Sequence, residues 1–169
     1  MDRIMDSMNF FKSLLFLILV HGLVVIYLPL YQINGGSQID TGLLAYLAIP
    51  LWLIGEAIVL WCFWLFSFHG QGTPLPIDPP KKLVIIGLYK YVRNPIYLGV
   101  LLLLTGHVFW FGRANLILYL LTIFLAFHTF ILFYEEPTLR KKFGASYEQY
   151  LKQVPRWLPR LSKEPSRNG

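Results

Sequence analysis

The residues best suited to chemistry gather at residues 87–99, which read Gly-Leu-Tyr-Lys-Tyr-Val-Arg-Asn-Pro-Ile-Tyr-Leu-Gly. Two cations, Lys90 and Arg93, stand there with three tyrosines at the start of an apolar run. Cations are costly in hydrocarbon and Pro95 removes a backbone donor, so a lipid-spanning helix does not need this collection for itself. The stretch indicates a site that holds something polar; a belt of tyrosines and basic residues at headgroup depth is the alternative.

Two adjacent carboxylates, Glu135 and Glu136, follow the last apolar run. Helix C-termini disfavour anions, so the position indicates a role that offsets this cost. Consecutive helical residues lie about 100° apart, so we expect only one carboxylate to face the groove between helices. Glu135, seven residues after His128, is the candidate. For Glu136, a surface ion pair with Arg140 or Lys141 is an equal alternative.

The composition predicts an all-α, polytopic membrane protein. Of the 169 residues, 56% are hydrophobic, 17% are aromatic and only 14% are charged, so a water-soluble surface would be hard to cover. The net charge of +6 comes from cations beside apolar runs, which favours membrane lipids over nucleic acid as partners. The single cysteine, Cys62, excludes an intramolecular disulfide, and no cluster of residues predicts a metal site.

Four apolar runs predict about four transmembrane helices, at residues 10–28, 43–68, 96–111 and 116–134. A tight turn separates the last two, so they are expected to form an antiparallel hairpin. Of the 15 Lys and Arg residues, only Arg113 then falls on the outer side. By the positive-inside rule both termini are cytoplasmic. Arg93 and the Glu135-Glu136 pair are therefore expected to be neighbours at the cytoplasmic end of the hairpin.

The whole chain, residues 1–169, is expected to form a single membrane domain. Its parts are an N-terminal helix pair (1–69), a proline-rich cytoplasmic connector with part of the site (70–95), the helical hairpin (96–134) and a cytoplasmic C-terminal segment (135–169). In the last part, apolar residues recur at three- and four-residue steps: Leu139, Phe143, Tyr147, Leu151 and Val154. That pattern predicts an amphipathic helix at the membrane interface, with a bend at Gly144.

Several short motifs in this order carry a resemblance to a known family. They are Gly87-x-Tyr89, Arg93-Asn94-Pro95-x-Tyr97-x-Gly99, Glu135-Glu136-x-x-Leu139, Phe143-Gly144-x-x-Tyr147-x-x-Tyr150 and Val154-Pro155-Arg156-x-Leu158-Pro159. Together they resemble the isoprenylcysteine carboxyl methyltransferase and phospholipid methyltransferase superfamily, over about half of the chain. The first two spans resemble it only in being hydrophobic.

The resemblance implies a bacterial-type integral membrane methyltransferase that uses S-adenosyl-L-methionine. It implies methyl transfer to a lipophilic acceptor at the cytoplasmic face of the bacterial inner membrane. The implied cofactor-binding residues are Leu83, Val84, Tyr89, Tyr97, Leu102, Thr105 and Glu135. The implied catalytic residues are Arg93, Asn94 and Glu136, with Glu136 or His128 as the base if one is used. Asn94 stands where the isoprenylcysteine branch has histidine, which weakens any transfer of prenylcysteine specificity.

Two other functions remain open at this point. Membrane sterol reductases resemble the same superfamily, so a reductase that uses NADPH is one alternative. A non-catalytic membrane subunit is the other, although the presence of both motifs argues against it. The intramembrane polar residues are expected to be structural: His21 and Glu56 would pair, and His107 would pack far from Arg93.

Overall fold

A computed structural model describes residues 14–15, 17–69 and 83–159 of the chain. The described helices are η1 (Leu17–Tyr27), α2 (Leu28–Gln32), η2 (Gly42–Leu47), α3 (Ala48–His69), η3 (Gly87–Lys90), α4 (Pro95–Phe111), α5 (Ala114–Phe130), η4 (Ile131–Glu135), α6 (Glu136–Phe143) and α7 (Ala145–Gln153). Apart from an isolated β-bridge between Gln38 and Arg113, every element in these ranges is helical. The all-α prediction is confirmed.

Two helical stretches of the described chain, Gly42–Leu65 and Ala114–Phe143, are long and apolar enough to cross a membrane. Helix α4 is also apolar, but its 17 residues extend only about 25 Å at 1.5 Å per residue. Part of the first expected span, the connector at residues 70–82 and the cations near both chain ends lie outside the described residues. Membrane character therefore rests on these helices, while four spans, cytoplasmic termini and the division into parts stay predictions.

The outer faces of α3 and α5 carry large apolar side chains that no other described element covers. Leu53 on α3 and Leu118 on α5 are 69% and 68% exposed. Single exposed leucines are ordinary in soluble proteins, but here exposed apolar side chains recur over residues 49–64 of α3 and 117–125 of α5. Faces of this kind suit contact with lipid chains.

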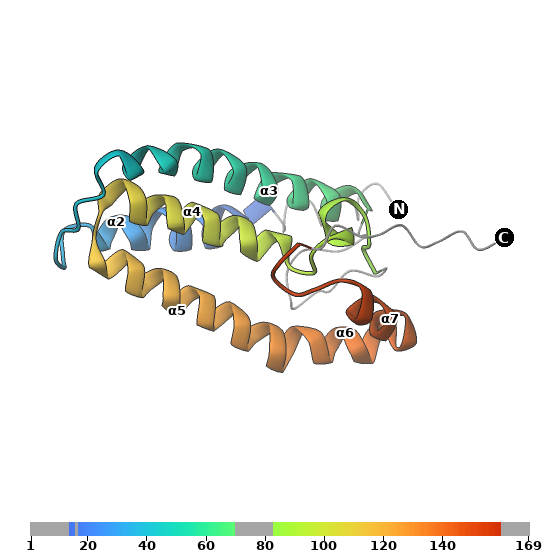
Figure 1. Cartoon of the computed structure of the whole chain (residues 1–169). Helices are drawn as coiled ribbons and strands as arrows, with labels where there is room; N and C mark the ends of the chain where they lie inside the picture. Colours follow the sequence, from blue (N-terminus) through green and yellow to red (C-terminus); the bar gives the residue numbers. More distant parts are fainter. Residues whose placement is uncertain (1–13, 16, 70–82, 160–169) are drawn as a thin grey trace.

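Helices α3 and α4 lie side by side because glycines line their contact (Figure 1). A β-carbon at Gly55 would lie 2.7 Å from the carbonyl oxygen of Gly99, and one at Gly106 would meet the Trp52 indole. Small residues let membrane helices approach closely and gain packing contacts. The start of α4, which carries the predicted site residues, is thus held firmly against α3.

A core of branched aliphatic side chains joins η1, α3 and α4, and α5 packs against it. Its buried members are Val25, Val59, Val100, Leu103 and Leu104. The Tyr119 hydroxyl donates a hydrogen bond of 2.7 Å to the Val24 carbonyl oxygen, which fastens α5 to η1. This core fixes the relative positions of α4 and α5. The 93–97 stretch lies at the start of α4, and the carboxylate pair follows the end of α5.

The end of the bundle opposite α6 and α7 is fastened by backbone hydrogen bonds (Figure 1). The Ile39 amide donates to the Gly112 carbonyl oxygen at 2.7 Å, and the Ala114 amide donates to the Ser37 carbonyl oxygen at 3.1 Å. Gly112 has φ of 55°, and a β-carbon there would clash with the Ile39 carbonyl oxygen. Glycine is therefore required at this turn, which joins α4 to α5 as the predicted hairpin.

The two π-helices, η1 and η4, each end two residues before a proline, at Pro29 and Pro137. Proline has no amide hydrogen and crowds the carbonyl four residues earlier, so the regular α-helical ladder is disrupted there. In η4 the Glu136 amide instead bonds to the Ile131 carbonyl oxygen, five residues back. This wide turn changes the register between α5 and α6.

The predicted C-terminal helix is two helices. Gly144, with φ of 53°, separates α6 from α7, so the expected bend is a complete break. Tyr147 and Val154, assigned to the membrane-facing stripe, are only 3% and 5% exposed, and they cluster with Leu83. Much of that stripe therefore packs inside the protein, because the segment that precedes η3 covers it.

Candidate active site

Two segments that are far apart in the sequence meet at one end of the bundle. The green segment that leads into α4 lies at the same end as α6 and α7 (Figure 1). Arg93 Nη1 donates to Glu136 Oε1 at 2.7 Å, and the Tyr97 hydroxyl donates to Glu135 Oε2 at 2.9 Å. These contacts confirm the expectation that Arg93 and the carboxylate pair are neighbours.

Glu136 is the centre of a buried ion cluster. Its residue surface is 6% exposed, and both of its carboxylate oxygens accept hydrogen bonds from guanidinium groups. Arg156 binds it in bidentate fashion, with Nε to Oε1 at 2.8 Å and Nη2 to Oε2 at 3.0 Å. The hydrogen bond to Glu136 raises the pKa of Arg156, so the cluster holds two fixed cations around one anion.

The surface alternative for Glu136 is wrong. Arg140 instead pairs with Glu148 at 3.0 Å, with both side chains about half exposed. Helix geometry led us to expect only one carboxylate to face the groove, but both Glu135 and Glu136 bind partners from the 93–97 stretch. The wide turn η4 and the reach of the Arg93 side chain account for this difference.

One hydrogen-bond donor of the Arg93 side chain is unused among the described residues. Its Nε is buried and has no hydrogen-bond partner among the described residues. A buried N–H group without an acceptor is costly, and native structures contain few of them. The Arg93 side chain is only 13% exposed, so water has little access to this donor. An anionic oxygen from a ligand would suit it.

A carboxylate and two aromatic rings stand beside Arg93. The rings of Tyr97 and Phe127 lie 4.6 Å apart between centroids, and the Tyr97 hydroxyl holds Glu135. Aromatic faces attract cations, and a carboxylate adds a full opposite charge. This corner therefore suits a positively charged group, next to a donor that suits a negative one.

Asn94 holds the C-terminal chain in place. It is 6% exposed, and its Nδ2 donates to the Arg156 carbonyl oxygen at 3.2 Å. The neighbouring Arg93 amide donates to the Pro155 carbonyl oxygen at 2.9 Å. Two consecutive residues thus bind two consecutive carbonyl groups, and one N–H of the Asn94 side chain is used in this contact.

Leu83 and Val84 face two different clusters. Leu83 packs with Tyr147 of α7, whereas Val84 packs with Cys62 and Tyr89 beside α3. The Tyr150 hydroxyl donates to the Tyr89 carbonyl oxygen at 2.8 Å and so joins the two clusters. Burial raises the pKa of Tyr89, Tyr147 and Tyr150, so these phenols stay neutral.

Two of the expected cofactor residues lie further along α4. Leu102 and Thr105 follow Tyr97 by one to two helical turns, toward the opposite end of the bundle. The Thr105 hydroxyl donates to the Leu101 carbonyl oxygen at 2.7 Å, within its own helix. The structure brings Arg93, Asn94, Tyr97, Glu135 and Glu136 together more directly than these two.

Two residues of the site were not among those proposed from the sequence. Arg156 contributes to the ion cluster, and the Trp157 indole N–H donates to His128 Nδ1 at 3.1 Å. Trp157 also packs on Phe124, with ring centroids 5.2 Å apart. Arg156 belongs to the Val154-Pro155-Arg156 motif, so a charged residue in a C-terminal motif was the available signal.

The polar residues inside the helices have structural partners. His21 Nε2 lies 3.1 Å from Glu56 Oε2, which confirms the expected pair. His107 Nδ1 lies 3.2 Å from Trp52 Nε1, and the two rings meet edge to face at 5.5 Å. His107 packs as expected, away from Arg93.

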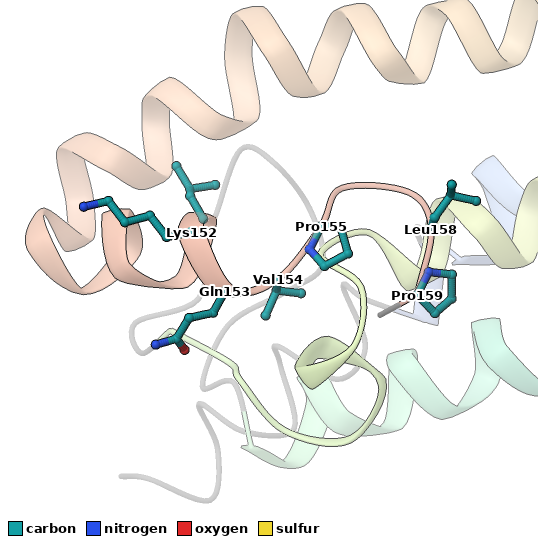
Figure 2. A pocket seen from close by; sticks show the side chains of 7 residues that line it. Lys152, Gln153, Val154, Pro155, Leu158 and Pro159 are labelled. Carbon is teal, nitrogen blue, oxygen red and sulfur yellow. The ribbon is translucent and has the colours of Figure 1, made fainter. Parts of the chain in front are cut away.

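A hollow of about 410 Å³ lies on the C-terminal side of α7 (Figure 2). It is lined by Leu151, Lys152, Gln153, Val154, Pro155, Leu158 and Pro159. None of the catalytic or cofactor-binding residues proposed from the sequence lines it. The hollow is open, and the paired charges of the ion cluster are not part of its wall, so the site is defined by the Arg93–Glu136 region instead.

Comparison with known families agrees with this geometry. Residues 43–146 match the family described as phospholipid methyltransferase. This is more than half of the chain, and it includes both Arg93 and the Glu135-Glu136 pair. The chain belongs to the phospholipid methyltransferase family. The resemblance read from the sequence motifs is confirmed, and Arg156 lies beyond the matched range.

One curated relative of this phospholipid methyltransferase family member is the protein-S-isoprenylcysteine O-methyltransferase of Schizosaccharomyces pombe (strain 972 / ATCC 24843). The two sequences are 36% identical over 77 residues, which is 46% of this chain and 33% of that protein. The chain thus spans about a third of the length of that relative. No solved structure matches the chain.

Proposed function

We propose that this protein transfers a methyl group from S-adenosylmethionine to a lipid or prenylated acceptor, at the cytoplasmic face of the bacterial inner membrane. The observation that carries the proposal is the pairing of Glu135 with Tyr97 beside Arg93, whose Nε has no acceptor in the part of the chain that the structure describes. Membership of the phospholipid methyltransferase family supports the reaction class. The exposed apolar faces of α3 and α5 support an acceptor that arrives through the lipid.

The donor set fits the proposed cofactor. S-adenosylmethionine supplies an activated methyl group on a sulfonium, and its amino-acid end carries one positive and one negative charge. Glu135 would hold a positive group beside the rings of Tyr97 and Phe127. The buried Nε of Arg93 would bind the carboxylate. One corner of the bundle therefore offers a partner for each charge.

The remaining cofactor residues form the proposed wall. Val84 and Tyr89, at 9% and 8% exposed, would support it from behind, and Leu83 would close it on the side of α7. Leu102 and Thr105 would line it along α4. The Thr105 hydroxyl already donates its hydrogen bond to the Leu101 carbonyl oxygen, so it would contact a ligand as an acceptor.

Glu136 and Asn94 act in this proposal by holding other groups. Both oxygens of Glu136 already accept from arginines, so its role is to fix the Arg93 guanidinium rather than to remove a proton. Asn94 fixes the C-terminal chain over the start of α4. Transfer of a methyl group from a sulfonium to a nucleophile disperses charge, so alignment and exclusion of water supply much of the acceleration. A carboxylate acceptor would need no base.

The test is calorimetric titration of the detergent-purified protein with S-adenosylhomocysteine, and with NADPH in parallel. We expect saturable binding of S-adenosylhomocysteine, weakened about tenfold or more by Glu135→Gln, because the lost charge no longer balances a cationic group. His107→Ala is the matched control and should bind normally. Binding of NADPH alone would replace the proposal with the reductase, and binding of neither would favour a non-catalytic subunit.

A further inference from the structure

The chain at residues 154–157, here called the C-terminal strap, crosses the start of α4 and returns to α5. Its Pro155 and Arg156 carbonyl oxygens are bound by the Arg93 amide and the Asn94 side chain. Its Trp157 donates to His128 and packs on Phe124. The strap is therefore attached to both helices of the hairpin, on either side of the ion cluster.

Within the strap, Arg156 makes two hydrogen bonds to the Glu136 carboxylate, one more than Arg93 makes. It occupies both carboxylate oxygens, whereas Arg93 reaches only Oε1, through Nη1. A bidentate arginine–carboxylate pair is the strongest arrangement available to these groups. Because Arg156 occupies that arrangement, Arg93 cannot also adopt it.

The consequence concerns the unused donor of Arg93. A bidentate arginine–carboxylate pair uses either Nη1 with Nη2 or Nε with Nη2, and Arg156 binds Glu136 through the second edge. Without Arg156, Arg93 could turn its own Nε–Nη2 edge to the same two oxygens. With Arg156 in this position, Arg93 binds Glu136 through Nη1, and its Nε has no acceptor among the described residues. Arg156 also adds the second cation, which makes the cluster positive overall.

We infer that Arg156 is a positioning residue, which keeps the Nε of Arg93 free for an anionic group of the ligand. This rests on the proposed function and adds to it a residue outside the range matched by the family. Arg156 makes its side-chain bonds to Glu136, so it acts on the ligand through Glu136 and Arg93. The ligand group concerned is the carboxylate at the amino-acid end of the cofactor.

The experiment compares two ligands in calorimetric titrations of the full chain in detergent. S-adenosylhomocysteine carries the amino-acid carboxylate, whereas 5′-methylthioadenosine keeps the adenosine and the sulfur but lacks the amino-acid end. Arg156→Gln should weaken binding of S-adenosylhomocysteine about tenfold and change binding of 5′-methylthioadenosine less than about twofold. A purely structural role for Arg156 would weaken both ligands alike.

Arg140→Gln is the matched control, because Arg140 also pairs with a glutamate, Glu148, but on the surface. It should leave both affinities unchanged. If Arg156→Gln does not fold, Arg156→Lys keeps the charge without the bidentate contact and should show the same ligand difference, to a smaller extent.

The outcomes separate this inference from the proposed function. If the wild-type protein binds S-adenosylhomocysteine but Arg156→Gln weakens both ligands equally, or neither, the inference is overturned and the proposed function stands. Equal wild-type affinity for the two ligands would also overturn it, since Arg93 would then gain nothing from the carboxylate. A wild-type protein that binds neither ligand would contradict the proposed function itself.

Discussion

The two ends of the helical bundle are fastened by different chemistry. At the end where α4 turns into α5, backbone amides of residues 37–39 and 112–114 bind each other and glycine allows the close approach. At the other end, buried side-chain charges of Arg93, Glu136 and Arg156 hold the chain together. The first end needs backbone hydrogen bonds and a glycine at position 112, whereas the second needs three charged side chains.

The difference supports the proposal that the end with the ion cluster binds the ligand. Backbone hydrogen bonds stabilise a turn without leaving any group unused. The ion cluster leaves a spare positive charge and a buried donor, which a fold built for stability alone would avoid, because buried ion pairs often stabilise less than apolar packing. The three predictions below test this contrast, from the largest expected effect to the smallest.

Removal of the Glu136 carboxylate should cause the largest loss of stability. Glu136→Ala leaves Arg93 and Arg156 facing each other without a counter-charge, at a cost of about 3–5 kcal/mol in the free energy of unfolding. Thermal melting in detergent measures it. Glu148→Ala, which breaks only the exposed pair with Arg140, is the control and should change stability by less than about 1 kcal/mol. Equal losses would show that the cluster is no more buried in solution than the surface pair.

A substitution at the backbone-fastened end should have the next largest effect. Gly112→Ala combines a left-handed backbone, which costs about 1–2 kcal/mol for an alanine, with a clash against Ile39. Gly42→Ala is the control, because Gly42 has φ of 49° but nothing within 4 Å of a β-carbon. The Gly112 variant should melt at the lower temperature. Identical melting would mean that the turn relaxes freely and that the close contact does not fasten this end.

The smallest loss of stability should come from a substitution in the C-terminal strap. Trp157→Phe keeps an aromatic ring against Phe124 but removes the N–H that binds His128, a loss of about 1 kcal/mol. Thermal melting with Leu158→Ala as the neighbouring control, at a residue that is 82% exposed, measures the difference. A loss as large as that of Glu136→Ala would show that the aromatic contact, and not the charges, holds this end.

The sequence predicted the meeting of Arg93 with the carboxylate pair for a physical reason. A tight turn makes an antiparallel hairpin, and an antiparallel hairpin brings the start of α4 beside the end of α5. The helical class followed in the same way from apolar runs. The family followed from motifs spread along the chain, although no single motif was specific.

The partners of individual side chains were less predictable. Periodicity placed Tyr147 and Val154 on one face but did not show that Leu83 would cover that face instead of lipid. The four-residue spacing predicted Arg140 as a partner of Glu136. Glu136 instead pairs with Arg156, 20 residues away, because the strap returns across α4. Such contacts depend on where distant segments arrive, which local patterns do not record.

The wide turn η4 separates two parts of what would otherwise be one continuous helix. In a regular helix, every side chain before the turn fixes the angular position of every side chain after it. The wider turn at Ile131–Glu135 adds a fixed angular offset to that relation. The exposed apolar face of α5 and the side chain of Glu136 at the start of α6 therefore do not have to follow one continuous helical stripe.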